Sequence, residues 1–139
     1  MNRAALISFV RHRGLAVLAT TNDAGRPQAA LVGVAATDRG EIIFDTVRSS
    51  RKYANLTRDG RVALVIGWDD EQTVQLEGIA EEIRQPENDP GVAAYYEQYP
   101  EGQERAHWPE IVYIRIIPDW VRYSDYRPNT FHIEETPLT

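Results

Sequence analysis

The chain has 139 residues, which is enough for one domain with its own hydrophobic core. Its net charge of -6 disfavours broad binding of nucleic acid, and the lack of cysteine excludes disulfides and thiolate metal sites and favours a reducing cytoplasm. The three histidines show no metal-ligand spacing, no apolar run has the length of a membrane span, and the N-terminus lacks a signal-peptide core. We therefore expect a single domain over residues 1–139, located in the cytoplasm, with no metal, membrane or nucleic-acid partner.

The first third of the chain predicts a helix followed by three strands. Residues 3–12 carry apolar side chains near one side, as an amphipathic helix does, and Gly14 follows as an end signal. Strands are expected over residues 15–21, 28–37 and 41–46, separated by the turn sequences NDAGRP and DRG. Because these turns are so short, the consecutive strands must be antiparallel.

The rest of the chain predicts further strands around a proline-rich insertion. A brief helix near residues 53–56 is capped by Gly60, and strands follow over 61–68 and 72–83, the second with a possible bulge at Gly78. Residues 85–109 contain four prolines and suit one or two short helices. Strands are expected over 110–118 and 119–126, and the tail after Arg127 has little pattern.

Six or seven short antiparallel strands with a few short helices predict a mainly β fold, and a small barrel rather than a sandwich. The early strands are apolar with few charges on either face. In so small a domain, such strands need a cover on their outer face, and a second copy of the chain is the simplest cover. We therefore expect a homodimer.

Charge is distributed unevenly along the sequence. Residues 48–61 contain five basic residues and one acid, a balance of +4, whereas residues 69–110 contain twelve acids and two bases, a balance of -10. A local positive patch in an acidic protein favours a compact anion as its ligand, since the rest of the surface would repel a polyanion. The alternative is that the basic residues form a solvated helix face.

The sequence Ser49-Ser50-Arg51-Lys52 stands where the second helix is expected to begin. The first turn of a helix has free backbone N–H groups and the positive end of the helix dipole, so it binds phosphate readily. Arginine can grip phosphate oxygens with two hydrogen bonds, lysine adds a mobile charge, and serine adds neutral donors. The pattern therefore predicts a phosphate site, with simple capping of the helix by Ser49 or Ser50 as the alternative.

The stretch EIIFDTVRSSRKYANLTRDGRVALVIGW resembles the phosphate-binding segment of the pyridoxamine 5'-phosphate oxidase-like, FMN-binding split-barrel flavoproteins. The preceding GLAVLATTNDAGRPQAALVGVAATDRG resembles the first hairpin of that family, and the resemblance covers residues 10–82. It implies a split barrel, a homodimer with the FMN site at the subunit interface, and hydride transfer to or from a small organic substrate. Ala29 and Val34 stand where vitamin B6 oxidases have basic residues, and VAAYYEQYPEG has no counterpart of their substrate-phosphate arginine, so oxidation of vitamin B6 is not expected.

The resemblance also implies which residues contact the cofactor. Arg51 and Lys52 would bind the FMN phosphate, with help from Ser50. The remaining implied contacts reach the flavin ring and ribityl chain from strands: Leu31, Val32, Gly33, Val34, Asp45, Thr46, and Thr73 or Gln75. The contact by Thr73 or Gln75 would come from the partner subunit. No catalytic acid or base stands out.

Three alternatives remain open from the sequence. Related split barrels bind the deazaflavin coenzyme, whose acidic tail would use extra basic residues such as Arg11, Arg13, Arg26 and Arg48. A non-catalytic flavin- or haem-binding protein would need a ligand such as His12 or His107 for haem. A structural dimer with a vestigial site is the third. The sequence assigns no role to His107, Trp120 or Arg127, and the late aromatic residues are expected in the core or an interface: Trp108, Trp120, Tyr123 and Tyr126.

Overall fold

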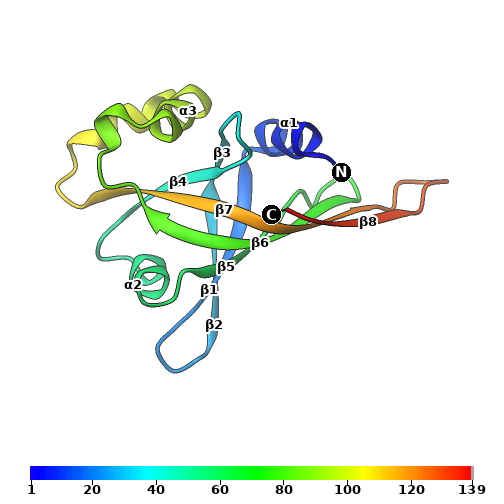
Figure 1. Ribbon diagram of the computed structural model, residues 1–139, viewed down its shortest axis with the longest axis horizontal. Coiled ribbons are helices and arrows are strands. Elements are labelled where there is room, and N and C mark those ends of the chain that lie inside the picture. Colours follow the sequence, from blue (N-terminus) through cyan, green and yellow to red (C-terminus); the bar gives the residue numbers. More distant parts are fainter. Residues whose placement is uncertain (139) are drawn as a thin grey trace.

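The computed structural model describes residues 1–138, which form one curled antiparallel sheet of eight strands. The strand order is β2-β1-β5-β6-β7-β4-β3, with β8 paired to β7, and the sheet curves into a half-barrel (Figure 1). The mainly β, antiparallel fold predicted from the sequence is confirmed. The strands are β1 (Leu15–Thr21), β2 (Pro27–Gly33), β3 (Ala35–Ala36), β4 (Ile42–Val47), β5 (Arg61–Ile66), β6 (Gln72–Glu82), β7 (Ile111–Asp125) and β8 (His132–Pro137).

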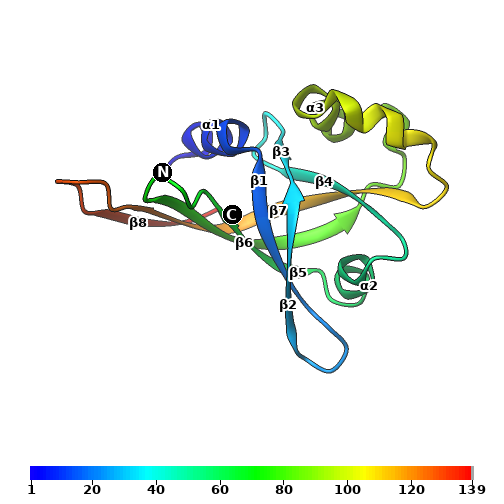
Figure 2. The same ribbon diagram turned by 180° about the vertical axis from the view of Figure 1, so that it is seen from behind.

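Short helices surround the sheet within the described residues. They are α1 (Arg3–Arg13), α2 (Arg51–Arg58), η1 (Pro86–Asn88), α3 (Pro90–Gln98) and η2 (Pro100–His107), where η denotes a 3₁₀ helix. Figures 1 and 2 show α1 and α3 on one side of the sheet and α2 at a separate edge. The β7–β8 hairpin extends away from the body as an arm. In this region, no helix is long and apolar enough to cross a membrane.

Two hydrophobic clusters hold the sheet and its helices together. The larger cluster fills the concave side and includes Phe44 and Ile114, both fully buried. The smaller cluster packs α3 against the opposite face of β4 and β7, around Ile43 and Tyr113. Because successive side chains of a strand point to opposite faces, β4 and β7 are buried on both sides. These two strands therefore form the layer between the barrel interior and α3.

The bulge predicted at Gly78 is confirmed, and it explains why β7 is longer than expected. The register between β6 and β7 shifts at Glu77 and Gly78, and Pro118 lies opposite Gly78. A Cβ on Gly78 would come 2.4 Å from the carbonyl oxygen of Ile117, so only glycine fits here. Proline is tolerated in a strand at a bulge, because ladder bonds are already interrupted there. The two strands predicted over 110–118 and 119–126 are consequently one strand.

Two other predicted boundaries were wrong. The strand expected over 28–37 divides at Val34, whose N–H donates to the carbonyl of Gly14 (2.9 Å), leaving β3 as a separate short strand. The patternless tail after Arg127 contains β8, whose residues are all exposed or half-buried. A strand that buries neither face does not show the alternation by which sequence analysis recognises strands.

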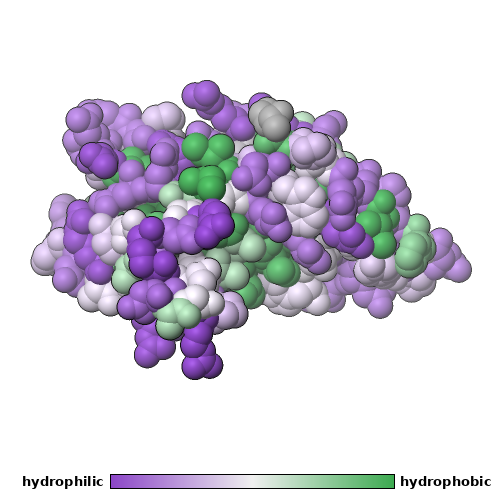
Figure 3. Space-filling view, turned by 60° about the horizontal axis from the view of Figure 1, so that its bottom comes forward, coloured by the Kyte–Doolittle hydropathy of each residue, from purple (hydrophilic) through white to green (hydrophobic). Residues whose placement is uncertain are grey.

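The outer face of the first strands exposes hydrophobic side chains. Leu31 of β2, Val17 of β1 and Val65 of β5 lie opposite one another across the sheet and therefore share this face. Leu31 is 62% exposed. Figure 3 shows hydrophobic residues at the surface of one face between hydrophilic ones. This is the type of surface on which we based the expected homodimer, which stays a prediction.

Candidate functional site

A cavity of about 320 Å³ lies beside the start of α2, where the sequence predicts a phosphate site. The helix contributes Arg51 and Lys52, and the end of β1 and start of β2 form the facing wall. We call this the cation cavity. Its lining residues are Thr20, Gln28, Ala29, Ala30, Arg51 and Lys52. The two alanines are the smallest side chains of this lining, and both belong to β2.

The basic residues of segment 48–61 fall into two groups, those that bond another group of the protein and those that have no carboxylate partner. Arg48 pairs with Glu82, Arg61 pairs with Asp59, and Arg58 donates to the backbone carbonyl of Thr21. In contrast, no carboxylate within residues 1–138 pairs with Arg51 or Lys52. These are also the two that line the cavity. The fold therefore leaves two positive charges facing one hollow, which is the electrostatic condition for binding a compact anion.

Ser50 caps α2 next to Arg51 but is not itself among the residues that line the cation cavity. Its Oγ accepts a hydrogen bond from the backbone N–H of Tyr53 (3.1 Å) and another from the hydroxyl of Thr46 (2.9 Å). Both bonds use the oxygen as acceptor, so its own proton has no acceptor among the described residues. Capping and anion binding, which the sequence posed as alternatives for Ser50, are thus compatible. The exposed Ser49 makes neither bond.

Sequence analysis missed a buried polar network behind the cavity wall. Asn55, only 6% exposed, donates from Nδ2 to the hydroxyl of Thr20 (3.0 Å) and to Oε1 of Gln28 (2.8 Å). This fixes the helix against both strands. Because the oxygen of Gln28 is occupied by Asn55, its amide nitrogen is the end left to donate elsewhere. An asparagine on the apolar face of α2, beside the buried Leu56, was the signal that could have revealed the network.

The residues expected to line a flavin ring on β2 alternate between two faces. Val32 and Val34 point into the core, whereas Leu31 is exposed on the outer face. Gly33 lies beneath Tyr99, and a Cβ there would come 2.9 Å from the tyrosine ring. As a terminal strand of the sheet, β2 pairs only with β1. Its outward backbone groups have no strand partner, which suits contacts made through the backbone.

Asp45 and Thr46 lie on opposite faces of β4, so they serve different parts of the molecule. Thr46 is buried and bonds Ser50 at the start of α2. Asp45 faces α3 and forms an ion pair with Nε of Arg105 (2.9 Å), which also donates to the hydroxyl of Tyr95 (3.0 Å). Burial, together with the charge of Asp45, raises the pKa of Tyr95, which keeps that phenol protonated. Neither residue lines the cation cavity, and Thr46 is linked to its edge only through Ser50, the residue before Arg51.

The other residues singled out from the sequence lie away from this cavity. Thr73 and Gln75 occupy the outer face of β6, where Gln75 is opposite Val65. Neither lines the cation cavity, so a contact with the cofactor through the partner subunit stays a prediction. Arg127 pairs with Asp125 and Trp120 is half-buried on β7. His12 and His107 are exposed, and the described residues contain no group of three or more potential metal ligands.

The curled antiparallel half-barrel defines the class of the protein, a split barrel, in which the cation cavity lies at the start of α2. Residues 3–125 match the family model described as pyridoxamine 5'-phosphate oxidase, and the chain belongs to that family. It is 34% identical over 92 residues to the pyridoxine/pyridoxamine 5'-phosphate oxidase of Bordetella avium, covering 66% of this chain and 42% of that protein. The chain thus spans less than half the length of this curated relative.

Solved structures agree with the fold. A conserved hypothetical protein from Mycobacterium tuberculosis superposes with a TM-score of 0.78 at 27% identity, covering 96% of this chain and 91% of the other. A heme binding protein from Mycobacterium smegmatis gives a TM-score of 0.80 at 18% identity, covering 99% of this chain and 58% of the other. At that identity the second likeness shows the fold alone. The split barrel expected from the sequence is confirmed.

Proposed function

We propose that this protein binds FMN, with the phosphate in the cation cavity, and acts as a flavin-dependent oxidoreductase on a small organic substrate. The proposal rests on the ion pairs around the start of α2, which leave two of the basic residues without a carboxylate partner. Arg51 and Lys52 lack a carboxylate partner within residues 1–138 and line the same cavity, whereas the neighbouring Arg48 and Arg61 are paired. Membership of the pyridoxamine 5'-phosphate oxidase family supports FMN as the molecule whose phosphate group occupies the cavity.

Each group around the cavity has a defined task in this proposal. Arg51 and Lys52 neutralise the phosphate, and the hydroxyl of Ser50 and the amide nitrogen of Gln28 donate hydrogen bonds to it. The outward backbone groups of β2 meet the polar edge of the ring, consistent with the implied contacts from residues 31–34. Bound FMN supplies the hydride-transfer chemistry. The chain supplies anchoring and a shaped, partly apolar surface, and no acid or base needs to be assigned.

We further propose that the working unit is a homodimer whose interface completes the site. The exposed hydrophobic row of Leu31, Val17 and Val65 adjoins Gln75 on the same outer face. A second copy covering this row would bring its own β6 residues, Thr73 or Gln75, toward the cofactor on β2. Light scattering should give twice the chain mass of 15.8 kDa. A monomer that binds FMN tightly would contradict the shared site.

The pairing of arginines favours FMN over the deazaflavin coenzyme. The acidic tail of that coenzyme would need unpaired cations, but Arg11 pairs with Asp38 and Arg13 pairs with Asp69 and Asp70. Arg48 pairs with Glu82, so among residues 1–138 Arg26 is the one candidate of the four without an ion pair. Haem is not favoured either, since no histidine lines the cation cavity.

The phosphate of a vitamin B6 substrate has no evident partner on this chain. Ala29 and Val34 are apolar where the oxidases carry basic residues, and α3 with its C-terminal cap presents Tyr95, Tyr96 and Tyr99 instead of an arginine. Arg105, in the η2 helix that follows α3, is occupied by Asp45. We therefore propose a substrate without a phosphate group.

Titration of the purified protein with FMN and with riboflavin tests the proposal. The two ligands share the ring and ribityl chain and differ by the phosphate. Hydrogen bonds to charged groups contribute about 1.5–3 kcal/mol each, so FMN should bind at least about tenfold more tightly. Flavin absorbance and fluorescence report the binding. Equal affinity for the two, or no binding of FMN, would refute the phosphate site. Bleaching of the bound flavin by reduced nicotinamide or small organic reductants then tests the redox role.

A further inference from the structure

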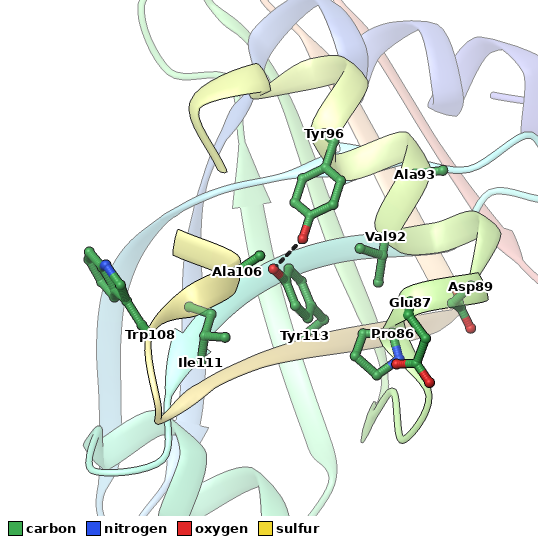
Figure 4. Close-up of a pocket in the computed structure, with 10 residues that line it drawn as sticks. All are labelled: Pro86, Glu87, Asp89, Val92, Ala93, Tyr96, Ala106, Trp108, Ile111 and Tyr113. Carbon is green, nitrogen blue, oxygen red and sulfur yellow. Dashed lines mark hydrogen bonds between the residues drawn. The ribbon is translucent and has the colours of Figure 1, made fainter. Parts of the chain in front are cut away.

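A second and larger cavity, of about 470 Å³, lies on the α3 side of the sheet and shares no lining residue with the cation cavity. One face of α3, the end of η2 and the start of β7 form it, as Figure 4 shows. We call it the aromatic cavity. Its lining residues are Pro86, Glu87, Asp89, Val92, Ala93, Tyr96, Ala106, Trp108, Ile111 and Tyr113. Its volume lies in the range of sites for small organic molecules.

The walls of the aromatic cavity are chiefly apolar and include three aromatic rings. Tyr96 and Tyr113 pack edge to face with their centroids 5.9 Å apart, and Trp108 stands at the far end (Figure 4). Trp108 is 52% exposed, a large apolar area for a single ring to leave in water. A planar ligand would cover that ring and gain the favourable contacts that aromatic pairs make.

The two tyrosine hydroxyls leave one hydrogen-bond donor unused. They meet across the cavity and bond each other, and neither has another partner within residues 1–138. Burial, with help from the bond to Tyr96, raises the pKa of Tyr113, so its hydroxyl stays protonated at neutral pH. The shared bond uses the proton of only one of the two hydroxyls. The other hydroxyl is therefore able to donate to an acceptor atom of a ligand in the cavity.

The charges at the cavity exclude an anion. None of the lining residues is basic, and Glu87 and Asp89 bring two carboxylates to one end. Asp89 is neutralised by Arg115, whose Nη2 lies 2.6 Å from both carboxylate oxygens. Glu87 has no ion pair among the described residues, so its negative charge would repel an anionic ligand.

We propose that the aromatic cavity is a binding site for a small uncharged aromatic compound that carries a carbonyl-type acceptor. The rings and aliphatic walls hold the planar part of the ligand, and the unused tyrosine proton donates to its carbonyl oxygen. This site goes beyond the proposed function and does not depend on FMN, because the two cavities are lined by different residues.

Three probes of similar size test the ligand class on the purified full-length chain. Acetophenone has the ring and the acceptor, toluene has the ring alone, and benzoate has the ring and a negative charge. The readout is the indole N–H signal of Trp108 in NMR spectra, assigned with a Trp108→Phe variant. Trp68 is a matched internal control, since it is 50% exposed but outside the cavity. We expect acetophenone to shift Trp108 in a saturable way and to leave Trp68 unchanged.

The expected order of affinity follows from the proposed contacts. Toluene should bind about twofold to tenfold more weakly than acetophenone, which corresponds to one net hydrogen bond, and benzoate more weakly still. No saturable shift of Trp108, equal shifts of Trp68, or preferred binding of benzoate would overturn the proposal.

Two variants locate the site and its donor. Ala106→Leu fills the cavity at an exposed position and should abolish binding, whereas the matched exposed change Ala4→Leu on α1 should not. Replacing both Tyr96 and Tyr113 by Phe removes the bonded pair without leaving either partner unsatisfied, so the fold should tolerate it. In this double variant acetophenone should lose its advantage over toluene. Unchanged binding in Ala106→Leu, or an unchanged advantage in the double variant, would overturn the proposal.

Discussion

The cation cavity and the aromatic cavity lie in segments of opposite charge, yet unpaired charge rather than total charge distinguishes them. Around α2, three of the five basic residues are occupied by a carboxylate or a carbonyl, and the remaining two face the cavity. Around α3, Arg115 neutralises Asp89 and leaves a cavity lined chiefly by apolar and aromatic groups. A net count of +4 or -10 would predict two strongly charged surfaces. The fold instead gives one cavity with two unpaired cations and one cavity without a basic residue, which we propose bind an anion and an uncharged molecule.

The comparison shows why a charge run is a weak predictor of a site. Some charges in such a run pair with residues that lie far away in the sequence, as Arg48 does with Glu82 and Arg105 with Asp45. An exposed pair contributes little to stability and little field to its surroundings. A charge that the fold leaves facing a cavity retains its full attraction for a ligand. The following variants test that distinction, beginning with the largest expected effect.

Replacing both unpaired cations should remove phosphate recognition. In the double variant Arg51→Ala and Lys52→Ala, the affinity for FMN should fall by about a hundredfold or more, because each charge-assisted bond is worth about 1.5–3 kcal/mol. Riboflavin affinity should stay within about twofold, since riboflavin has no phosphate. Fluorescence titration with both ligands measures the two constants. An equal loss for both would indicate general damage to the pocket and contradict the assignment.

Removing the buried amide behind the cavity should affect both stability and binding. Asn55→Ala leaves the hydroxyl of Thr20 and the amide of Gln28 without their shared partner, so the free energy of unfolding should fall by about 1–3 kcal/mol. Affinity for FMN should fall by about tenfold, because Gln28 loses its fixed orientation. Urea unfolding and FMN titration measure these effects. Thr57→Ala is the matched control, since that exposed hydroxyl bonds only carbonyls of its own helix. Equal behaviour of the two variants would contradict a positioning role for Asn55.

The sequence predicted the repeating parts of the fold and the charged end of the site. Strand alternation, the turn sequences and the Ser-Arg-Lys start of α2 are local signals, and they located most of the sheet and two cavity residues, Arg51 and Lys52. Local sequence patterns gave wrong strand boundaries where a residue far away in the sequence determines the backbone conformation. Pro118 was taken as a strand end because its bulge partner, Gly78, lies 40 positions earlier in the numbering.

The same limit applies to the site. The pairing of Asn55 with Thr20 and Gln28 crosses about 30 residues of sequence. The place of Asn55 on the apolar face of α2 marks a buried amide, but it does not identify these two partners. Of the core and interface places expected for Trp108, the core is wrong, because the side chain is half exposed at the edge of a cavity, and the interface stays a prediction. Both features depend on how helices dock on the sheet, and side-chain type alone does not determine that docking.

The ion pair beside the aromatic cavity should make stability depend on pH. Burial alone would raise the pKa of Asp89, but hydrogen bonds from Arg115 and from backbone N–H groups outweigh burial and lower it. A carboxyl with a lowered pKa stabilises the fold above its ordinary pKa near 4 and loses that contribution as the pH falls through the lowered value. Asp89→Asn keeps the cap on α3 but removes the charge. The variant should be about 1 kcal/mol less stable at neutral pH, since Glu41 and Glu81 remain near Arg115.

Urea unfolding from about pH 7 down to about pH 2.5 measures this dependence. The difference in unfolding free energy between the native chain and Asp89→Asn should shrink as the pH falls. At low pH the carboxyl group of Asp89 is protonated and uncharged, so the native chain loses the same charge that the asparagine variant lacks at every pH. FMN affinity should not change, since Asp89 is outside the cation cavity. A difference that is constant with pH would mean that the charge of Asp89 does not stabilise the fold.

The smallest effect is expected from the paired arginine beside the cation cavity. Arg48 is exposed, pairs with Glu82 (3.2 Å) and donates to the hydroxyl of Tyr53 (2.9 Å). Arg48→Ala should change the free energy of unfolding by no more than about 1 kcal/mol, as for exposed ion pairs, and should change FMN affinity by less than about threefold. The single variant Arg51→Ala removes the same charge three positions away and should lower FMN affinity by about tenfold or more. If the two single variants lower FMN affinity equally, the affinity depends on the total charge of the segment. In that case, the absence of an ion pair does not identify the residues that bind FMN.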